Sequence, residues 1–325
     1  MQAQRLEQPH LRCCNPQALD TLNSSIIPII VTYNPEKDIL LASLKALLAQ
    51  ANTIIVVDNG SSFPIEDILQ NLPSTQAANI KLLKLNHNYG LGKAYNVGIM
   101  LARSLKAAFI LLMDHDSIPE SNMLYKLHNA FICLEKQGKL IAAVGPRYRD
   151  YRTDRLSEFV AVGSFGLTRL RCTHSIHYVR ADFIISSGSL ISLRSLDQIG
   201  DMDEELFIDH IDTEWCFRAK AKGFEIYGVC DAAMLHSLGE RQVRVWWGRW
   251  RSIPYHQPFR YYYMFRNSVL LWQRTYMPDA WKRADKIRML YFLLFFIIVS
   301  PNRIANLCMM VKGLKDGFLK QSGKL

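Results

Sequence analysis

The chain has 325 residues, of which 49% are hydrophobic and 21% are charged, and its formal net charge is +10. This composition excludes a disordered polymer, and the length suits one large domain or one domain with an appendage. Seven scattered cysteines without a CxxC pair favour reduced thiols in the cytosol over disulfides. The first 17 residues contain no apolar core, so we expect no cleaved secretion signal.

Positive charge is concentrated in residues 241–325, which hold 16 Lys and Arg against three acids, whereas residues 1–240 hold 23 against 26. Such a tail is expected to meet an anionic surface, either nucleic acid or membrane. Its apolar run, 289–301, is too short to predict a membrane span. Basic flanks favour a helix that lies on anionic lipid, and the alternative is a helix buried in a protein core. No recognition helix or aromatic stacking motif supports nucleic-acid binding.

From about residue 25, short apolar runs alternate with helical patterns along the chain. The predicted buried strands are 26–31, 53–58, 80–85 and 108–113. The predicted helices follow them, the first after Asn34-Pro35 with leucines up to Leu48, the others over 64–72, 92–106 and 119–137. Strands that alternate with helices predict right-handed crossovers and a mostly parallel α/β sheet.

Polar clusters follow three of the four predicted strands. Thr32-Tyr33-Asn34 ends the first strand, Asp58-Asn59-Gly60 the second and Asp114-His115-Asp116 the fourth. Ligands of open α/β sheets bind beyond the carboxyl ends of the strands. The three clusters therefore predict a ligand-binding cleft at one edge of the sheet.

Two of the polar segments are ambiguous on their own. Asp58 in "VVDNGSS" either forms a tight turn or accepts hydrogen bonds from a nucleoside. The glycine-rich segment 86–98, "NHNYGLGKAYNVG", fits neither standard phosphate loop. It either packs closely as a turn before a helix or offers Lys93 and the helix N-terminus to a phosphate.

Asp114 and Asp116 form a stronger candidate site. Residues two apart in an extended segment point to the same side, so both carboxylates can reach one cation. Mg²⁺ and Mn²⁺ prefer such hard oxygen ligands. The alternative is that Asp116 caps the helix that starts near Pro119, which is compatible with metal binding by Asp114.

A second acidic segment lies at 206–224, which reads as a helix that ends at Gly223. Glu214 and Arg218 have the spacing of a helical salt bridge, so Glu214 is assigned a structural role. Asp212 remains as an unpaired acid, either functional or placed in the first turn by the helix dipole. His236, after a further apolar stretch, is structural unless a metal site is already present, in which case imidazole can complete it.

Seven motifs in this order are similar to those of inverting family 2 glycosyltransferases of the GT-A fold. They are "VTYNP", "VVDNGS", "NxNYGxGKAYNxG", "LMDHDS", "ISSGSLIS", "DTEWCFRAKAKGF" and "MLHSLGE". More narrowly, the chain resembles the bacterial rhamnosyltransferase branch, over roughly residues 25–275 including "YYYMFRNSVLL". His115 departs from that branch, where glutamine is more usual, and would add an extra ligand or a pH-sensitive contact.

The resemblance implies a role for each matching residue. The residues expected around the pyrimidine nucleoside are Thr32, Tyr33, Asn34 and Asp58, and those expected near the sugar and diphosphate are Asn88, Gly90, Lys93 and Asp114. The implied ligands of Mg²⁺ or Mn²⁺ are Asp114, Asp116 and His236. Asp212 matches the catalytic base, and Gly188 with Trp215 lies where the acceptor is expected.

It further implies a tail (1–24), a GT-A catalytic domain (25–240) and a helical membrane-associating region (241–325). The donor implied is dTDP-L-rhamnose, and the acceptor a lipid-linked or growing polysaccharide or lipopolysaccharide glycan. We expect a cytoplasmic protein held peripherally on the inner face of the cell membrane. The alternatives are transfer of galactofuranose, glucose or N-acetylglucosamine, or a non-catalytic nucleotide- or lipid-binding module of a glycan assembly complex.

Overall fold

The computed structural model describes residues 25–150, 154–163, 166–173, 175–236, 241–246, 250–299 and 302–325. The predicted N-terminal tail and its two cysteines therefore lie outside the described residues. Within them, the strands of the main sheet are β1 (Ile26–Thr32), β2 (Ile54–Asp58), β3 (Ile80–Lys84), β4 (Phe109–Asp114), β5 (Ser117–Pro119), β6 (Ile141–Asp150), β9 (Tyr178–Ala181), β10 (Ser189–Ser192) and β11 (Glu225–His236).

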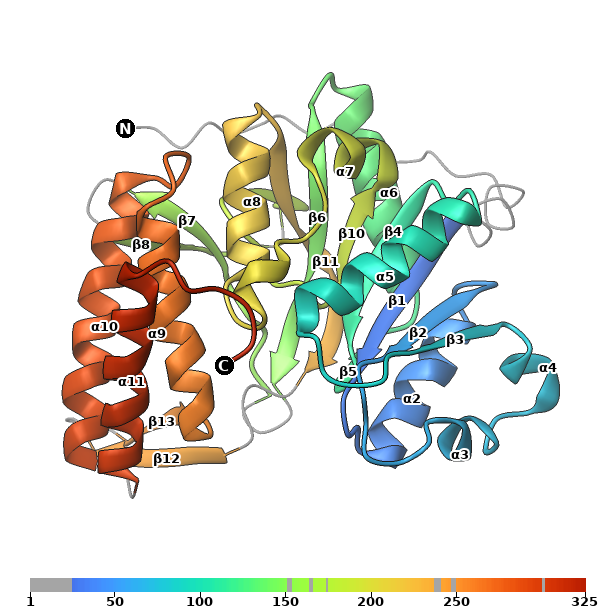
Figure 1. Ribbon diagram of the computed structural model, residues 1–325. Coiled ribbons are helices and arrows are strands. Elements are labelled where there is room, and N and C mark those ends of the chain that lie inside the picture. The colour runs from blue at the N-terminus through green and yellow to red at the C-terminus, as the bar shows by residue number, and fades with distance from the viewer. Residues whose placement is uncertain are drawn as a thin grey trace.

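The main sheet has the order β3-β2-β1-β4-β10-β6-β11-β5, with β9 paired to β11 (Figure 1). The pairs β1–β2, β1–β4, β2–β3 and β6–β11 are parallel. Because β10 is antiparallel to both β4 and β6, these two strands also run in the same direction. The predicted mostly parallel α/β sheet is thus confirmed, and the antiparallel β10 between β4 and β6 is an addition that the sequence did not indicate.

Alternation along the strands explains the two layers of helices. Ile27, Ile29 and Val31 of β1 face a core formed with α5 (Leu91–Ser104), α7 (Leu193–Ile199) and α8 (Ile211–Ala221). Ile26 and Ile30 face the opposite core, formed with α2 (Lys37–Leu48) and α6 (Met123–Lys136). Burial of both faces of the sheet accounts for the continuous apolar run of β1. The minor helices are α3 (Glu66–Leu69), α4 (Ser74–Ala77) and η1 (Glu204–Leu206).

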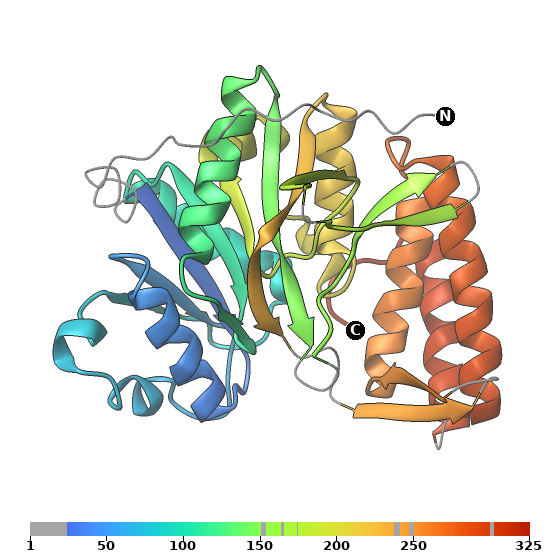
Figure 2. The ribbon, with the colours of Figure 1, turned by 180° about the vertical axis from the view of Figure 1, so that it is seen from behind.

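Three long helices stand beside the α/β body, as Figures 1 and 2 show. They are α9 (Pro258–Trp272), α10 (Asp279–Val299) and α11 (Arg303–Phe318). Two hairpins complete the described elements: β7 (Phe159–Gly163) with β8 (Gly166–Leu170), and β12 (Arg241–Trp246) with β13 (Trp250–Tyr255). The helices share a small core of Tyr261, Phe265, Met289, Phe296 and Met310. Among the described residues, no helix is long and apolar enough to cross a membrane.

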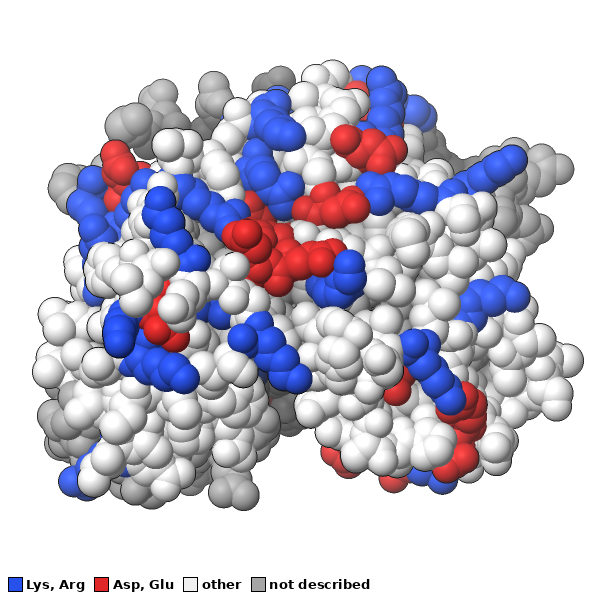
Figure 3. All heavy atoms as spheres, in the orientation of Figure 1, with Lys and Arg blue, Asp and Glu red and all other residues white. Residues whose placement is uncertain are grey.

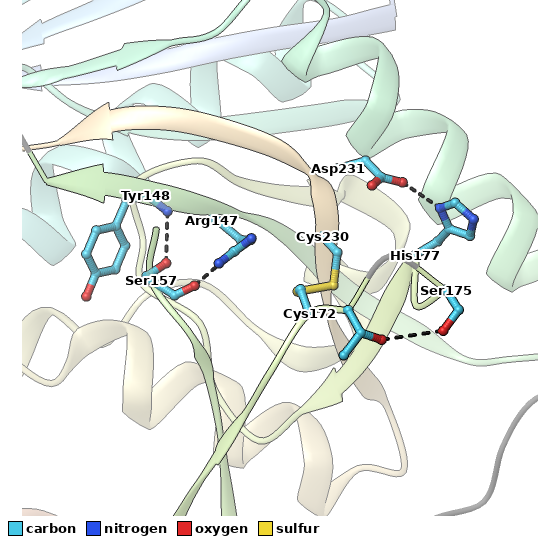
Figure 4. The surroundings of a disulfide bond; sticks show 9 residues. Arg147, Tyr148, Ser157, Cys172, Ser175, His177, Cys230 and Asp231 are labelled. Atoms are coloured by element: carbon cyan, nitrogen blue, oxygen red, sulfur yellow. Dashed lines mark hydrogen bonds and ion pairs between the residues drawn. A yellow bond between two sulfur atoms is a disulfide. The ribbon is translucent and has the colours of Figure 1, made fainter. Parts of the chain in front are cut away.

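One prediction is wrong: Cys172 and Cys230 form a disulfide instead of remaining reduced thiols. β9 pairs with β11, and Cys230 N donates to the His177 carbonyl at 2.9 Å. This pairing brings two cysteines that are 58 residues apart in sequence to a Cα–Cα distance of 5.6 Å (Figure 4). Cys133, Cys216 and Cys308 are the cysteines of the described part that form no disulfide.

Candidate functional site

The ends of β1 and β2 are joined by side chains as well as by the sheet. Thr32 and Asp58 are register partners, and Thr32 Oγ1 donates to Asp58 Oδ1 at 3.0 Å. Ser61 Oγ donates to the same oxygen at 2.5 Å, whereas Asp58 Oδ2 receives a long contact of 3.4 Å from Ser61 N. Asp58 therefore closes the turn and keeps one carboxylate oxygen weakly engaged, so the turn and nucleoside interpretations are compatible.

Asn34 and Tyr33 lie directly beyond this pair. Asn34 has a φ of 48°, and its Oδ1 accepts from Ser62 N and Ser62 Oγ, both at 2.8 Å. The loops after β1 and β2 are thus tied together. Tyr33 is 46% exposed, which leaves its ring free to contact a ligand.

Asn59 connects the β2 loop to the glycine-rich segment, a role that was not predicted. Its Nδ2 donates to Asn88 Oδ1 at 3.0 Å, and its Oδ1 accepts from Tyr89 N at 3.0 Å. Asn88 Oδ1 also accepts from Gly90 N at 2.9 Å. Asn88 and Gly90, which are expected near the sugar and diphosphate of the donor, are therefore held beside Asp58 by the side-chain amide of Asn59.

Gly90 requires its glycine for two independent reasons. Its φ of 93° is a left-handed conformation that disfavours side chains, and a Cβ there would lie 2.6 Å from the Phe207 carbonyl oxygen. The segment before α8 thus packs directly on the glycine-rich segment. Lys93, in the first turn of α5, is exposed and forms an ion pair with Glu204 at 3.2 Å.

Asp114, Asp116 and His236 meet at the carboxyl edge of the sheet. One ligand atom of each lies within 4.8 Å of the others, and Asp116 Oδ1 is 3.4 Å from His236 Nδ1. The cause is topological: β5 begins directly after Asp116 and pairs with β11, which places Ser117 opposite His236. Two carboxylates and one imidazole fit a divalent cation such as Mg²⁺ or Mn²⁺.

These three side chains alter one another's protonation. Burial, followed by the charge of Asp116, raises the pKa of Asp114. Burial also opposes ionisation of Asp116, but the hydrogen bond and charge of His236 outweigh it and lower the pKa of Asp116. Burial acts against the imidazolium as well, yet the two carboxylates raise the pKa of His236. Two carboxylates that lie close together in a partly buried site repel each other when ionised, and a cation bound between them offsets this repulsion.

Three residues that sequence reasoning missed hold the cluster in position. Tyr95 OH donates to Asp114 Oδ1 at 2.9 Å from a fully buried ring on α5. Ser117 Oγ lies 2.7 Å from His236 Nδ1, and Ser187 Oγ donates to Ser117 Oγ at 2.7 Å. Tyr95 and Ser187 belong to the quoted motifs "NxNYGxGKAYNxG" and "ISSGSLIS", which was the available signal.

The alternatives for this region are also decided by geometry. Asp116 does not cap α6, because β5 intervenes and the helix begins at Met123 after Asn122. His115 lies with Nδ1 3.4 Å from the Val31 carbonyl and is outside the group of candidate ligands. Its ring therefore contacts the backbone of β1.

Asp212 lies in the first turn of α8, close enough to Asp114 for their charges to interact. Burial raises the pKa of Asp212 to about 6, while hydrogen bonds from the backbone of Thr213 and Ser186 act in the opposite direction. Thr213 N donates to Asp212 Oδ1 at 2.7 Å. A carboxyl with a pKa near the working pH suits a general base.

Glu214, two residues on, is structural as predicted. It is fully buried and accepts from Arg218 Nε at 2.8 Å and Nη2 at 3.0 Å. Arg274, from the loop after α9, approaches the same carboxylate at 3.3 Å. The pairing leaves Asp212 as the acid of this turn without a basic partner among the described residues.

The structure places Trp215, which is expected near the acceptor, in the core of the domain. Trp215 is 2% exposed, and its Nε1 donates to the Gly200 carbonyl at 2.9 Å, so the indole belongs to the core. Gly188 has a φ of 82°, and a Cβ there would lie 2.5 Å from Pro146 Cγ. Close packing therefore accounts for that glycine without an acceptor.

A family described as Glycosyl transferase family 2 matches residues 28–190. The dTDP-rhamnosyl transferase RfbF of Shigella flexneri is 30% identical over 297 residues, which cover 91% of this chain and 96% of that protein.

Solved structures share the fold over most of this chain. GalNAc-T7 with UDP, GalNAc and Mn²⁺ superposes with a TM-score of 0.57 at 14% identity, covering 91% of this chain and 56% of that one. The mannosyltransferase PcManGT of Pyrobaculum calidifontis, in complex with GDP-Man and Mn²⁺, gives 0.54 at 11% identity, covering 91% and 88%. At these identities the likeness shows a shared fold, and the expected GT-A fold is confirmed.

Proposed function

The chain belongs to glycosyl transferase family 2, and we propose that it transfers L-rhamnose from dTDP-L-rhamnose to a lipid-linked or growing polysaccharide or lipopolysaccharide glycan. The observation that carries the proposal is the cluster of Asp114, Asp116 and His236 beside Asp212. It combines a cation site with a nearby base, the two groups that transfer from a nucleotide sugar requires. The similarity to a dTDP-rhamnosyl transferase over nearly its whole length supports the donor.

Mg²⁺ or Mn²⁺ would be held by Asp116, His236 and Asp114. The donor atoms already converge, and the pKa of Asp116 is lowered, so this carboxylate is ionised at neutral pH. When bound, the cation offsets the negative charge of the diphosphate leaving group. Ser117 and Tyr95 orient the ligands in advance through their hydrogen bonds to His236 and Asp114.

The nucleoside would bind between the ends of β1 and β2. The weakly engaged Oδ2 of Asp58 can accept a hydrogen bond from the pyrimidine, and exposed Tyr33 can cover the ring. Thr32 and Asn34 fix the positions of the two loops. On the diphosphate side, Asn88 and Gly90 shape the loop, and Lys93 would exchange its exposed ion pair with Glu204 for a phosphate.

Asp212 would act as the catalytic base. The acceptor hydroxyl oxygen forms a bond to the anomeric carbon of rhamnose while the bond between that carbon and the dTDP oxygen breaks. The hydroxyl proton passes to Asp212, and dTDP leaves with the bonding electron pair. One displacement inverts the anomeric centre, so no covalent enzyme intermediate is needed.

The acceptor would be reached at the inner face of the cell membrane. On α10, Ile287, Leu290, Tyr291 and Leu294 are 56%, 56%, 67% and 49% exposed and recur at helical spacing on one face. The same helix buries Met289 and Phe296, so it is partly a core helix and partly an apolar surface.

Figure 3 shows few charged side chains over the lower part of the three helices, with Lys and Arg above it. Helix α10 also carries the basic residues Lys282, Arg283, Lys286 and Arg288. An apolar helix face with basic neighbours fits the interface of an anionic bilayer.

A donor panel tests this function. Release of nucleoside diphosphate is measured for dTDP-L-rhamnose and for uridine diphosphate galactofuranose, glucose and N-acetylglucosamine, each with Mg²⁺ or Mn²⁺ and without metal. We expect the fastest release with dTDP-L-rhamnose and a loss of activity without metal. A uridine donor that outperforms it would assign another sugar. No release from any donor would indicate a non-catalytic module.

A further inference from the structure

The segment 203–210 links the proposed donor site to the proposed base. Leu91 N, at the start of α5, donates to the Phe207 carbonyl at 2.6 Å, and α8 with Asp212 begins directly after His210. Three non-glycine residues of the segment, Phe207, Asp209 and His210, have φ values of 63°, 65° and 65°. Such left-handed backbone persists only where the surroundings fix it.

Asn267 of α9 supplies that support. Its side chain is fully buried, and its Nδ2 donates to the carbonyls of Leu206 at 2.9 Å, Ile208 at 2.7 Å and Asp209 at 3.0 Å. One amide group therefore fixes three carbonyls of the left-handed turn. The Nδ2 group has only two protons, so the three carbonyl oxygens share them.

Arg266 determines which way that amide faces. Asn267 Oδ1 accepts from Arg266 Nε at 3.0 Å and Nη2 at 2.8 Å, which leaves Nδ2 directed at the segment. Arg266 Nη2 also donates to the carbonyls of Glu205 at 3.1 Å and Leu206 at 2.9 Å. Arg266 is itself fully buried, so the guanidinium is stabilised by these carbonyls instead of water.

Further contacts tie the same segment to α9 and α10. Arg260 pairs with Asp209 at 3.1 Å. His210 Nε2 lies 3.2 Å from Ser268 Oγ and 3.2 Å from Arg288 Nη2. The ring of Tyr263 stacks on Phe207 with a centroid distance of 4.9 Å. Every residue with a left-handed conformation here is therefore contacted by the C-terminal helices.

We propose that Arg266 and Asn267 are positioning residues that act through segment 203–210 on Asp212. The direction of the Asp212 carboxylate depends on the backbone that leads into α8, and this backbone is held by carbonyl contacts from α9. The C-terminal helices would thereby complete the catalytic site as well as provide a membrane-facing surface. This inference rests on the proposed role of Asp212.

The matched control is Gln273, another amide at the end of α9. Its Nε2 donates to the Val269 carbonyl at 3.2 Å and to the Gly317 carbonyl of α11 at 3.0 Å, and among the described residues no hydrogen bond joins its side chain to segment 203–210. Gln273→Ala removes an amide bridge between helices of the same region. It separates loss of packing from loss of positioning.

The experiment compares Asn267→Asp, Asn267→Ala, Asn267→Ser and Gln273→Ala in the full chain. Measured are kcat, the donor KM, dTDP affinity by calorimetry and the thermal midpoint, with Asp212→Asn as reference. Asn267→Asp keeps the shape and the bond to Arg266 but presents oxygen to three carbonyls. We expect kcat to fall about 10- to 100-fold for Asn267→Asp and Asn267→Ala, with dTDP affinity changed less than about threefold.

Asn267→Ser keeps one donor and should lose less, about 3- to 10-fold in kcat; it carries the test if the other two variants do not fold. Gln273→Ala should retain kcat within about twofold even if its thermal midpoint falls. Wild-type kcat in the Asn267 variants, or an equal kcat loss in Gln273→Ala, would overturn the positioning role. If Asp212→Asn were fully active, the base assignment itself would fail, a result distinct from either.

Discussion

His236 at the end of β11 lies 3.4 Å from Asp116, because β5 carries the chain from Asp116 directly into pairing with β11. The two residues belong to distant parts of the sequence, yet strand register fixes their separation. The cluster is therefore a property of the sheet and not of a flexible loop. This relationship makes the proposed cation site testable without any sugar substrate.

Replacing Asp116 or His236 by Ala is expected to weaken Mn²⁺ binding at least about tenfold, since each removes one of three converging ligands. Free Mn²⁺ measured by electron paramagnetic resonance gives the affinity directly. His177→Ala is the control, because His177 forms an exposed pair with Asp231 at 2.6 Å outside the cluster. Equal Mn²⁺ affinity in His236→Ala and His177→Ala would remove His236 from the site.

The pH dependence of kcat/KM should show an acid limb near pH 6, where burial places the pKa of Asp212. The base accepts a proton only when ionised, so activity is full above this pKa and falls about tenfold per pH unit below it. The profile is measured at saturating Mn²⁺ so that loss of the cation does not contribute. Activity that stays constant down to pH 5 would contradict the assignment.

Reduction of the Cys172–Cys230 disulfide is expected to lower the free energy of unfolding by about 2–4 kcal/mol, since it opens a loop of 58 residues. Urea denaturation with and without dithiothreitol measures the difference. A Cys172→Ala/Cys230→Ala double variant should be insensitive to the reductant. Because disulfides are rare in the cytosol, the state of this bond in cells is tested by treating freshly lysed cells with an alkylating reagent. Alkylation of both Cys172 and Cys230 would show that the bond is absent there.

Glutamate at Leu290 and Leu294 together should reduce binding to anionic vesicles about tenfold or more, because two exposed apolar side chains of α10 are replaced by charges of the lipid's sign. Co-sedimentation with phosphatidylglycerol vesicles measures it. Met100→Glu is the control, since Met100 is 66% exposed on α5 in the α/β body. Unchanged sedimentation of the double variant would exclude this face as the membrane contact.

The parts of the fold that follow local pattern could be predicted from the sequence. The strands β1, β2 and β4 are continuous apolar runs with polar ends, so their positions, and the arrival of Asp58 and Asp114 at one edge, followed from residue type alone. Helix starts were less accurate: α6 begins at Met123 and not near Pro119, because β5 occupies the intervening residues.

Features that depend on strand pairing could not be predicted. The disulfide requires β9 beside β11, and the support of His236 by Ser117 requires β5 beside β11. The burial of Trp215 was not predictable either, because a tryptophan near Asp212 in the sequence is equally compatible with a surface or a core position, and its burial and hydrogen bond to Gly200 are visible only in the fold. The contacts of Asn267 with segment 203–210 are likewise visible only once α9 is docked.

The most direct test of the proposed function is the rate of dTDP release from dTDP-L-rhamnose, in the presence of acceptor and Mn²⁺, by the wild-type protein and by Asp212→Asn. The substitution keeps the size of the side chain but removes the proton acceptor. The account predicts that the variant binds dTDP as the wild type does while release slows by about 10²- to 10⁴-fold. Unchanged turnover in Asp212→Asn would contradict it.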